Sequence, residues 1–120
     1  AALVEDALAM QARGFAGSKV KIGKPHLAQD DARLGAVRAA VGDAYHIFTD
    51  ANQGFSLHQA MLRADMLARH GVGWFEEPLP ADDVGAHAQL ARHSRVPIAV
   101  GESLYSVSQF KDYMVAGAAS

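Results

Sequence analysis

The chain has 120 residues, and half of them are apolar, which is enough for one domain with its own hydrophobic core. Its formal net charge is −2 with acidic and basic residues intermixed, so the sequence lacks the basic character that nucleic-acid binding requires. The absence of cysteine excludes disulfides and thiolate metal sites, and no apolar run approaches the length of a membrane span. We therefore expect a cytoplasmic protein without nucleic-acid or membrane partners.

Amphipathic helices and short apolar strands alternate along the sequence. The expected helices begin at residue 2, at Asp30 or Asp31, at Ser56, at Asp82 or Asp83, and at Ser106. The expected strands are 19–23, 45–49, 72–76 and 97–100. Ser56 with Gln59 has the spacing of a capping box, and Ser106 with Gln109 repeats it. The sequence therefore predicts one helix followed by four strand–helix units.

This alternation is typical of an α/β protein whose parallel strands are joined by helical crossovers. Two architectures satisfy it: an open doubly wound sheet, or part of an eight-stranded barrel. Both place functional residues at the carboxyl ends of the strands. No glycine-rich phosphate loop follows any expected strand, which counts against the nucleotide-binding form of the open sheet.

Three acidic residues occupy the same point of successive strand–helix units. Asp50, Glu76 and Glu102 each follow an apolar strand, and consecutive acids are 26 residues apart. Side by side at one sheet edge, three carboxylates repel one another unless a divalent cation lies between them. All-oxygen ligation suits Mg²⁺ before Mn²⁺ or Ca²⁺, whereas the His and Cys spacings of zinc sites are absent. The alternative for each acid alone is a helix cap or a surface ion pair.

Two lysines precede these acids on the first expected strand. Lys19 and Lys21 share one face of the strand because side chains alternate, and Asp50 and Asn52 share a face for the same reason. Two close ammonium groups lower each other's proton affinity, which would prepare one of them to act as a general base. Asn52 would contact a substrate or order a metal-bound water. The alternative is an exposed lysine pair on an edge strand.

The other notable side chains have structural interpretations. Glu77 must point away from Glu76, so we expect it to be a structural partner, and Trp74 shares the parity of Glu76 and is expected in a barrel core. His26 lies in a loop at the same edge as the acids, where a solvated side chain is favoured over a pocket residue. The remaining histidines are expected at the surface or at helix ends: His46, His58, His70, His87 and His93.

The combination of four short motifs resembles the enolase superfamily, and in particular its mandelate racemase subgroup with the sugar-acid dehydratases. The motifs are Lys19-Val20-Lys21, Asp50-Ala51-Asn52, Glu76-Glu77-Pro78 and Gly101-Glu102-Ser103. The resemblance covers the whole chain, and the combination is specific although each motif alone is common. The related muconate-lactonizing subgroup usually has Asp at the third acid, so Glu102 favours the racemase and dehydratase branch.

The resemblance implies a partial (β/α)8 barrel of about four consecutive parallel strand–helix units. Residues 1–120 would then be a fragment of the C-terminal barrel domain, without the N-terminal capping domain and the other barrel strands. Superfamily members are several times longer and are often homo-oligomers. The His–Asp dyad that supplies the second acid/base of this subgroup would lie beyond Ser120.

The resemblance also implies a reaction. Asp50, Glu76 and Glu102 would hold Mg²⁺, and Lys21 would remove the proton α to a substrate carboxylate, giving a metal-stabilised enediolate. Lys19 would lower the proton affinity of Lys21 and contact the substrate carboxylate. We expect a lyase that dehydrates an acid sugar. The alternatives are a racemase or epimerase of an α-hydroxy or related acid, and a non-catalytic metal-binding relative; a receiver-like signalling module is disfavoured because its acids precede its lysine.

Overall fold

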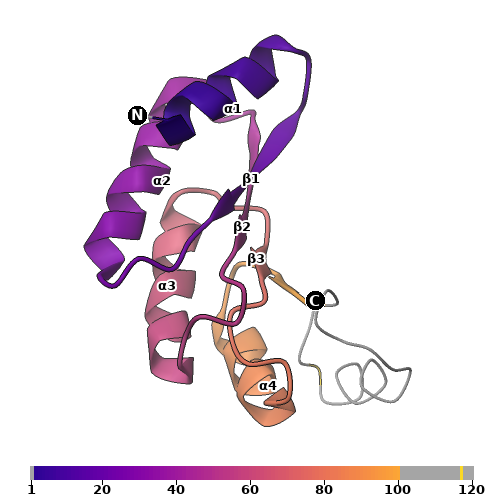
Figure 1. Ribbon diagram of the computed structural model, residues 1–120. Helices are drawn as coiled ribbons and strands as arrows, with labels where there is room; N and C mark the ends of the chain where they lie inside the picture. Colours follow the sequence, from indigo (N-terminus) through magenta and orange to yellow (C-terminus); the bar gives the residue numbers. More distant parts are fainter. Residues whose placement is uncertain (1, 101–116, 118–120) are drawn as a thin grey trace.

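The computed structural model describes residues 2–100 and residue 117 (Figure 1). The described elements are α1 (Ala2–Ala12), β1 (Gly17–Lys21), α2 (Leu27–Val41), β2 (His46–Asp50), α3 (Leu57–Arg69), β3 (Phe75–Glu76), α4 (Val84–His93) and β4 (Ile98–Ala99). Among these elements, none of the helices has the length and apolar character needed to cross a membrane. The expected helix at Ser106 and the predicted metal ligand Glu102 lie outside the described residues.

The strands form one sheet in the order β1-β2-β3-β4, and every neighbouring pair is parallel. The register places Lys21 beside Asp50, Asp50 beside Glu76, and Glu76 beside Ala99. These residues therefore form one row across the sheet at the carboxyl ends of its strands. This arrangement confirms the predicted alternation of helices with parallel strands.

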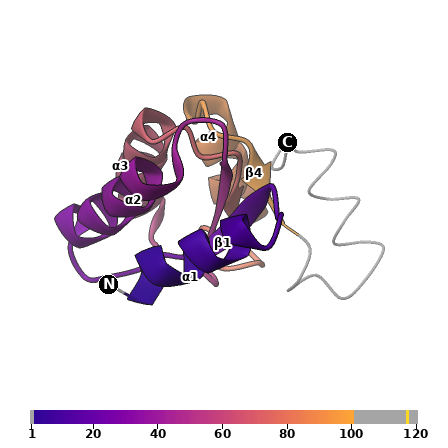
Figure 2. The same cartoon turned by 90° about the horizontal axis from the view of Figure 1, so that it is seen from above.

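The helices form an arc around the strands, as seen from above in Figure 2. One side chain of each strand points into the layer between strands and helices and is buried there: Val20, Ile47, Phe75 and Ile98. Leu34 of α2, Leu67 of α3 and Leu90 of α4 fill the same core, and none of these three has exposed surface. The opposite face of the sheet carries Lys19 and Lys21, which are exposed. The apolar layer thus fixes which side chains of each strand face away from the helices.

Side-chain caps begin two of the helices as predicted. The Ser56 amide donates to Gln59 Oε1 over 3.0 Å and the Gln59 amide donates to Ser56 Oγ over 3.3 Å, which completes the capping box of α3. Asp83 is the N-cap of α4, because its Oδ1 accepts the Ala86 amide at 3.0 Å.

The predicted start of α2 was wrong. The helix begins at Leu27, because His26 occupies the N-cap position and its amide donates to Gln29 Oε1 over 3.0 Å. Asp30 consequently lies in the first turn and is completely buried, instead of capping the helix. The strand β1 is also displaced, since it runs over Gly17–Lys21 where 19–23 was expected.

The prediction for His87 was also wrong. The side chain has no exposed surface and lies on the inner face of α4, where a surface or helix-end position was expected. Its Nδ1 is 2.9 Å from the Asp83 carbonyl oxygen, one helical turn earlier. In a short helix, the sequence pattern around a buried histidine does not differ from that around a surface histidine. The burial of His87 is therefore evident only from the folded structure.

Candidate functional site

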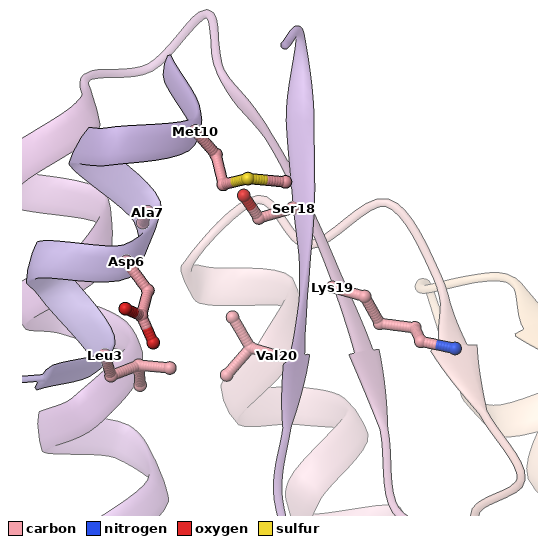
Figure 3. Close-up of a pocket in the computed structure, with 7 residues that line it drawn as sticks. All are labelled: Leu3, Asp6, Ala7, Met10, Ser18, Lys19 and Val20. Atoms are coloured by element: carbon pink, nitrogen blue, oxygen red, sulfur yellow. The ribbon is translucent and has the colours of Figure 1, made fainter. Parts of the chain in front are cut away.

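The candidate site is the row of charged side chains at the carboxyl ends of β1, β2 and β3. Lys19 and Lys21 come from β1, Asp50 ends β2, and Glu76 ends β3. The register of the sheet and the alternation of side chains bring these groups to one face of the sheet. Figure 3 shows Lys19 extending from β1 away from α1, whereas Val20 points toward that helix.

Asp50 is the centre of the row and is completely buried. Its Oδ2 accepts a hydrogen bond from Lys21 Nζ at 2.7 Å and lies 3.6 Å from Lys19 Nζ. Its Oδ1 accepts the amide of Asn52 at 2.9 Å. The φ of Asn52 is +48°, in the left-handed region that Asn tolerates better than most residues. That conformation turns the Asn52 amide back toward the carboxylate that ends the strand.

Lys19 connects the two described acids. Its Nζ donates to Glu76 Oε2 over 3.0 Å, in addition to its 3.6 Å contact with Asp50. Lys21 Nζ makes a second contact of 3.2 Å, to Asn52 Oδ1. Each carboxylate of the row therefore has an ammonium partner. The two lysines balance the negative charge of Asp50 and Glu76.

The neighbouring charges shift the protonation of the acids in opposite directions. Burial raises the pKa of the Asp50 carboxyl, but the hydrogen bonds from Lys21 and the Asn52 amide outweigh it, so the net pKa of Asp50 lies below its ordinary value. Burial is also the largest effect on Glu76, and together with the adjacent Asp50 it raises the pKa of Glu76 despite the hydrogen bond from Lys19. The pKa values of the two neighbouring carboxyl groups are therefore shifted apart, with Asp50 the stronger acid of the pair.

The hydrogen bond to Glu76 raises the pKa of Lys19, and this outweighs the opposing effect of burial. The lysine pair was expected to have lowered proton affinities. That expectation is not met for Lys19, because the acids beside it raise its pKa more than burial lowers it. In this arrangement Lys19 is a counter-charge for the carboxylates.

The described residues fit part of a site for a hard divalent cation. Asp50 and Glu76 offer carboxylate oxygens from adjacent strands in direct register, and these are the ligands that Mg²⁺ prefers. Within residues 2–100 and 117, no cluster of three or more His, Cys, Asp or Glu side chains forms a complete metal site. The third predicted ligand, Glu102, lies outside that part of the chain.

Other predicted residues surround the row. Glu77 is buried with a φ of +50°, and its amide donates to the Ala99 carbonyl over 2.9 Å. Trp74 is half-buried and its ring stacks on Phe48 with centroids 3.8 Å apart. His26 is exposed at the start of α2. Of these three, only Trp74 lies on the sheet face that carries the charged row, as its parity predicted.

A hollow lies between α1 and β1, and Lys19 of the charged row is among the residues that line it (Figure 3). Its lining is mainly apolar, with Leu3, Ala7 and Met10 from the helix and Val20 from the strand. The hollow therefore lies on the helix side of β1, whereas Asp50 and Glu76 end the neighbouring strands on the other face. We place the candidate site at the charged row because that is where the reactive side chains meet.

Sequence reasoning missed a buried charged cluster beside the row. Asp30 and Arg63 form an ion pair of 3.2 Å between α2 and α3, and Arg33 lies 3.1 Å from the same carboxylate. The signal for Arg63 was its spacing in α3, three residues from Ala60 and four from Leu67, both of which are buried. An arginine at a position of the inner helix face predicts a buried partner.

Comparisons with known proteins identify the family and agree with the fold. Residues 2–120 match the family model described as Enolase C-terminal domain-like. The chain is 39% identical over 105 residues to the L-talarate/galactarate dehydratase of Salmonella typhimurium, an alignment that covers 88% of this chain and 26% of that enzyme.

Two solved structures superpose closely on the chain. A racemase from Streptomyces coelicolor A3(2) with bound magnesium has a TM-score of 0.95 at 34% identity, covering 98% of this chain and 33% of that one. L-Talarate dehydratase from Polaromonas sp. JS666, complexed with Mg and L-glucarate, has a TM-score of 0.92 at 39% identity, covering 97% and 32% respectively.

The chain spans about a quarter to a third of the length of these relatives. The relatives include a dehydratase of acid sugars and a racemase, and two of their structures contain magnesium. The sequence resemblance and the partial-barrel fold are both confirmed. The chain belongs to the enolase C-terminal domain-like family.

Proposed function

We propose that residues 1–120 are consecutive strand–helix units of a (β/α)8 barrel within a longer enzyme that removes the proton α to a carboxylate. The observation that carries the proposal is the row in which Lys21 contacts Asp50 at 2.7 Å and Asp50 pairs in register with Glu76. Strand ends are where barrels of this kind keep their reactive groups. At that edge the candidate base Lys21 lies beside the candidate metal ligands Asp50 and Glu76.

In the proposed reaction Lys21 takes the α-proton of a small carboxylic acid. Its Nζ lies at the surface of the row with a side chain that is 59% exposed, so a substrate is able to reach it. To act as a base, Lys21 must first release the proton that it now donates to Asp50. Lys19 and Asn52 border the same position and are proposed to contact the substrate.

We propose that Asp50, Glu76 and Glu102 hold the cation that the reaction requires. Mg²⁺ bound there would supply positive charge where negative charge develops on the substrate carboxylate as the proton leaves. This assignment is supported by the buried Asp50 carboxylate, by its partner Glu76 in the next strand, and by the magnesium present in two related structures.

Dehydration of an acid sugar is the favoured outcome of proton removal. The 39% identity to L-talarate/galactarate dehydratase supports it, as does the likeness to a talarate dehydratase that binds L-glucarate. Racemisation or epimerisation is the second candidate, and it is favoured by the TM-score of 0.95 to the Streptomyces racemase. Both outcomes begin with the same proton transfer, and they differ in whether a β-hydroxyl leaves or a proton returns.

The test is to incubate the complete protein with Mg²⁺ and a panel of aldonic and aldaric acids in D₂O. We expect exchange of the α-proton by NMR, together with a 2-keto acid product from at least one substrate. Lys21→Ala should reduce exchange by at least 10²-fold, the usual contribution of a general base, and leave Mg²⁺ binding intact.

The matched control is Arg13→Ala. Arg13 precedes β1, whereas Lys21 ends that strand, and the Arg13 guanidinium lies over the Phe15 ring. This variant should exchange as the wild type does. Exchange retained by Lys21→Ala would remove Lys21 as the base. Mg²⁺ binding without exchange by the wild type, on every acid of the panel, would instead identify a non-catalytic metal-binding relative.

A further inference from the structure

A buried ion pair joins α2 to α3 directly beneath the loop that follows β1. Arg63 Nε lies 3.2 Å from Asp30 Oδ2, and the two side chains are 5% and 0% exposed. Removing both charges from water is costly, and a buried pair often stabilises no better than apolar residues of the same volume. Its contacts with the rest of the chain therefore indicate what it does.

The Asp30–Arg63 pair holds the loop backbone at several points. The Asp30 carboxylate accepts the Gly23 amide at 3.0 Å and the Lys24 amide at 3.4 Å. Arg63 Nη2 donates to the Lys24 carbonyl over 2.9 Å. Gly23 has a φ of +130°, a conformation that L side chains rarely adopt and that the loop requires to present these amides to Asp30.

Arg33 extends the same cluster to Lys21 itself. Its Nη1 donates to the Lys21 carbonyl over 3.2 Å and lies 3.1 Å from Asp30 Oδ1. On the other side, the amide of Ile22 donates to the Asp50 carbonyl over 3.0 Å. The peptide unit that follows the Lys21 Cα is therefore held by both its carbonyl and its amide.

Arg63 also contacts the segment that follows β2. Its guanidinium lies 4.7 Å from the centroid of the Phe55 ring, and the Phe55 amide donates to the Pro78 carbonyl over 3.1 Å. Phe55 comes three residues after Asn52, whose Oδ1 accepts from Lys21 Nζ at 3.2 Å. One guanidinium thus contacts both the loop that follows Lys21 and the segment that follows Asn52.

We propose that Asp30 and Arg63, with Arg33, are positioning residues that set the place of the Lys21 ammonium relative to Asp50 and the substrate. This inference rests on the proposed function of Lys21 as the base. None of the three side chains contacts the acids of the row. They act through the backbone of residues 21–24, and a base displaced by about 1 Å loses on the order of 10²-fold in rate.

Two conservative variants of the complete protein test the inference. Arg63→Lys keeps a positive charge beside Asp30 but loses the second donor that reaches the Lys24 carbonyl. Asp30→Asn keeps the size of the side chain but loses the charge that draws two loop amides and two arginines together. For both variants we expect kcat for α-proton exchange to fall on the order of 10²-fold, with KM and the Mg²⁺ dissociation constant little changed.

Asp31→Asn is the matched control. Asp31 is the next residue of α2 and also pairs with the C-terminal end of α3, through His70 at 2.5 Å and Arg69 at 3.7 Å, and both of these partners lie away from the loop after β1. This variant should lose thermal stability, as the other two do, and keep the wild-type kcat. Arg63→Lys or Asp30→Asn with unchanged kcat, or a kcat loss that Asp31→Asn reproduces, would overturn the positioning role.

The two proposals fail in different ways. A wild-type protein that shows no Lys21-dependent exchange on any acid overturns the proposed function, and the positioning role with it. Wild-type exchange that is lost in Lys21→Ala but retained in Asp30→Asn and Arg63→Lys overturns the positioning role alone.

Discussion

At the scale of single residues, Asp50 shows how a completely buried carboxylate stays ionised. Its Oδ2 accepts from Lys21 and its Oδ1 accepts the Asn52 amide, so both oxygens have a donor. These contacts outweigh the cost of burial and keep the pKa of Asp50 below its ordinary value. Under the proposed function, this carboxylate would exchange an ammonium partner for Mg²⁺.

His87 gives the residue-scale prediction about pH. Burial lowers the pKa of His87, and this outweighs its contact with the Asp83 carbonyl and the charges of Asp83 and Glu77. The unfolded chain therefore binds a proton at a pH where the folded chain does not. The contribution of neutral His87 to stability is complete above the unfolded pKa of about 6.5 and is lost as the pH falls below it.

Urea unfolding at several pH values checks this prediction. We expect the free energy of unfolding to fall between neutral and mildly acidic pH, and to fall less in His87→Gln. The control is His58→Gln, which replaces an exposed histidine of α3 and should keep the wild-type dependence. Equal pH dependence in the wild type and His87→Gln would contradict the assignment of a buried neutral imidazole.

The face of the sheet on which a side chain lies was predictable where its position in a strand alone determined it. Lys21, Asp50 and Glu76 end strands, Lys19 lies two residues before Lys21, and the alternation of strand side chains brings all four to one face. Asp30 was not predictable in the same way, because an acid in a first helical turn is equally suited to capping. Its burial depends on Arg63, which is 33 residues away and comes from another helix.

At the scale of elements, β1 and β2 approach each other closely at Gly17. A Cβ at Gly17 would lie 2.7 Å from both the Cβ and the carbonyl oxygen of His46. The pairing of Gly17 with His46 therefore begins the parallel ladder that ends with Lys21 beside Asp50. The close pairing at the start of β1 and the pairing of Lys21 with Asp50 at its end are therefore parts of one hydrogen-bonded ladder.

Gly17→Ala should destabilise the fold by about 1–3 kcal/mol, because the added methyl group would clash with the Cβ and the carbonyl oxygen of His46 in the paired strand. Gly85→Ala is the control, since a Cβ at Gly85 meets nothing within 4 Å and the residue lies in α4. Alanine there should be neutral or stabilise by up to about 1 kcal/mol. Denaturant unfolding measures both, and a Gly17→Ala variant as stable as the wild type would contradict the close pairing.

The existence and order of the described elements followed from the sequence, whereas their ends did not. Ser56 with Gln59 marked the start of α3 correctly because a capping box is a local signal. The strands β3 and β4 are only two residues long, Phe75–Glu76 and Ile98–Ala99, although longer apolar runs surround them. Apolar character indicates burial, but the ends of a strand depend on hydrogen bonds to its neighbours.

At the scale of the whole molecule, the chain is an arc of parallel strands with helices outside it (Figure 2). Among the described strands, β1 and β4 each pair on one side only. Related proteins are three to four times longer, as the coverage of 26–33% of their lengths shows. We therefore expect the charged row to reach its working geometry inside a complete barrel, with the third ligand and the second acid/base supplied by later residues.

The measurement that tests the central claim most directly is a crystal structure of the complete protein grown with Mg²⁺. We predict one ion with oxygens of Asp50, Glu76 and Glu102 about 2.0–2.1 Å away, and Lys21 Nζ directed at the substrate position beside it. An ion bound elsewhere, or carboxylates of Asp50 and Glu76 that stay paired with Lys19 and Lys21 at saturating Mg²⁺, would contradict the proposed metal site and the reaction built on it.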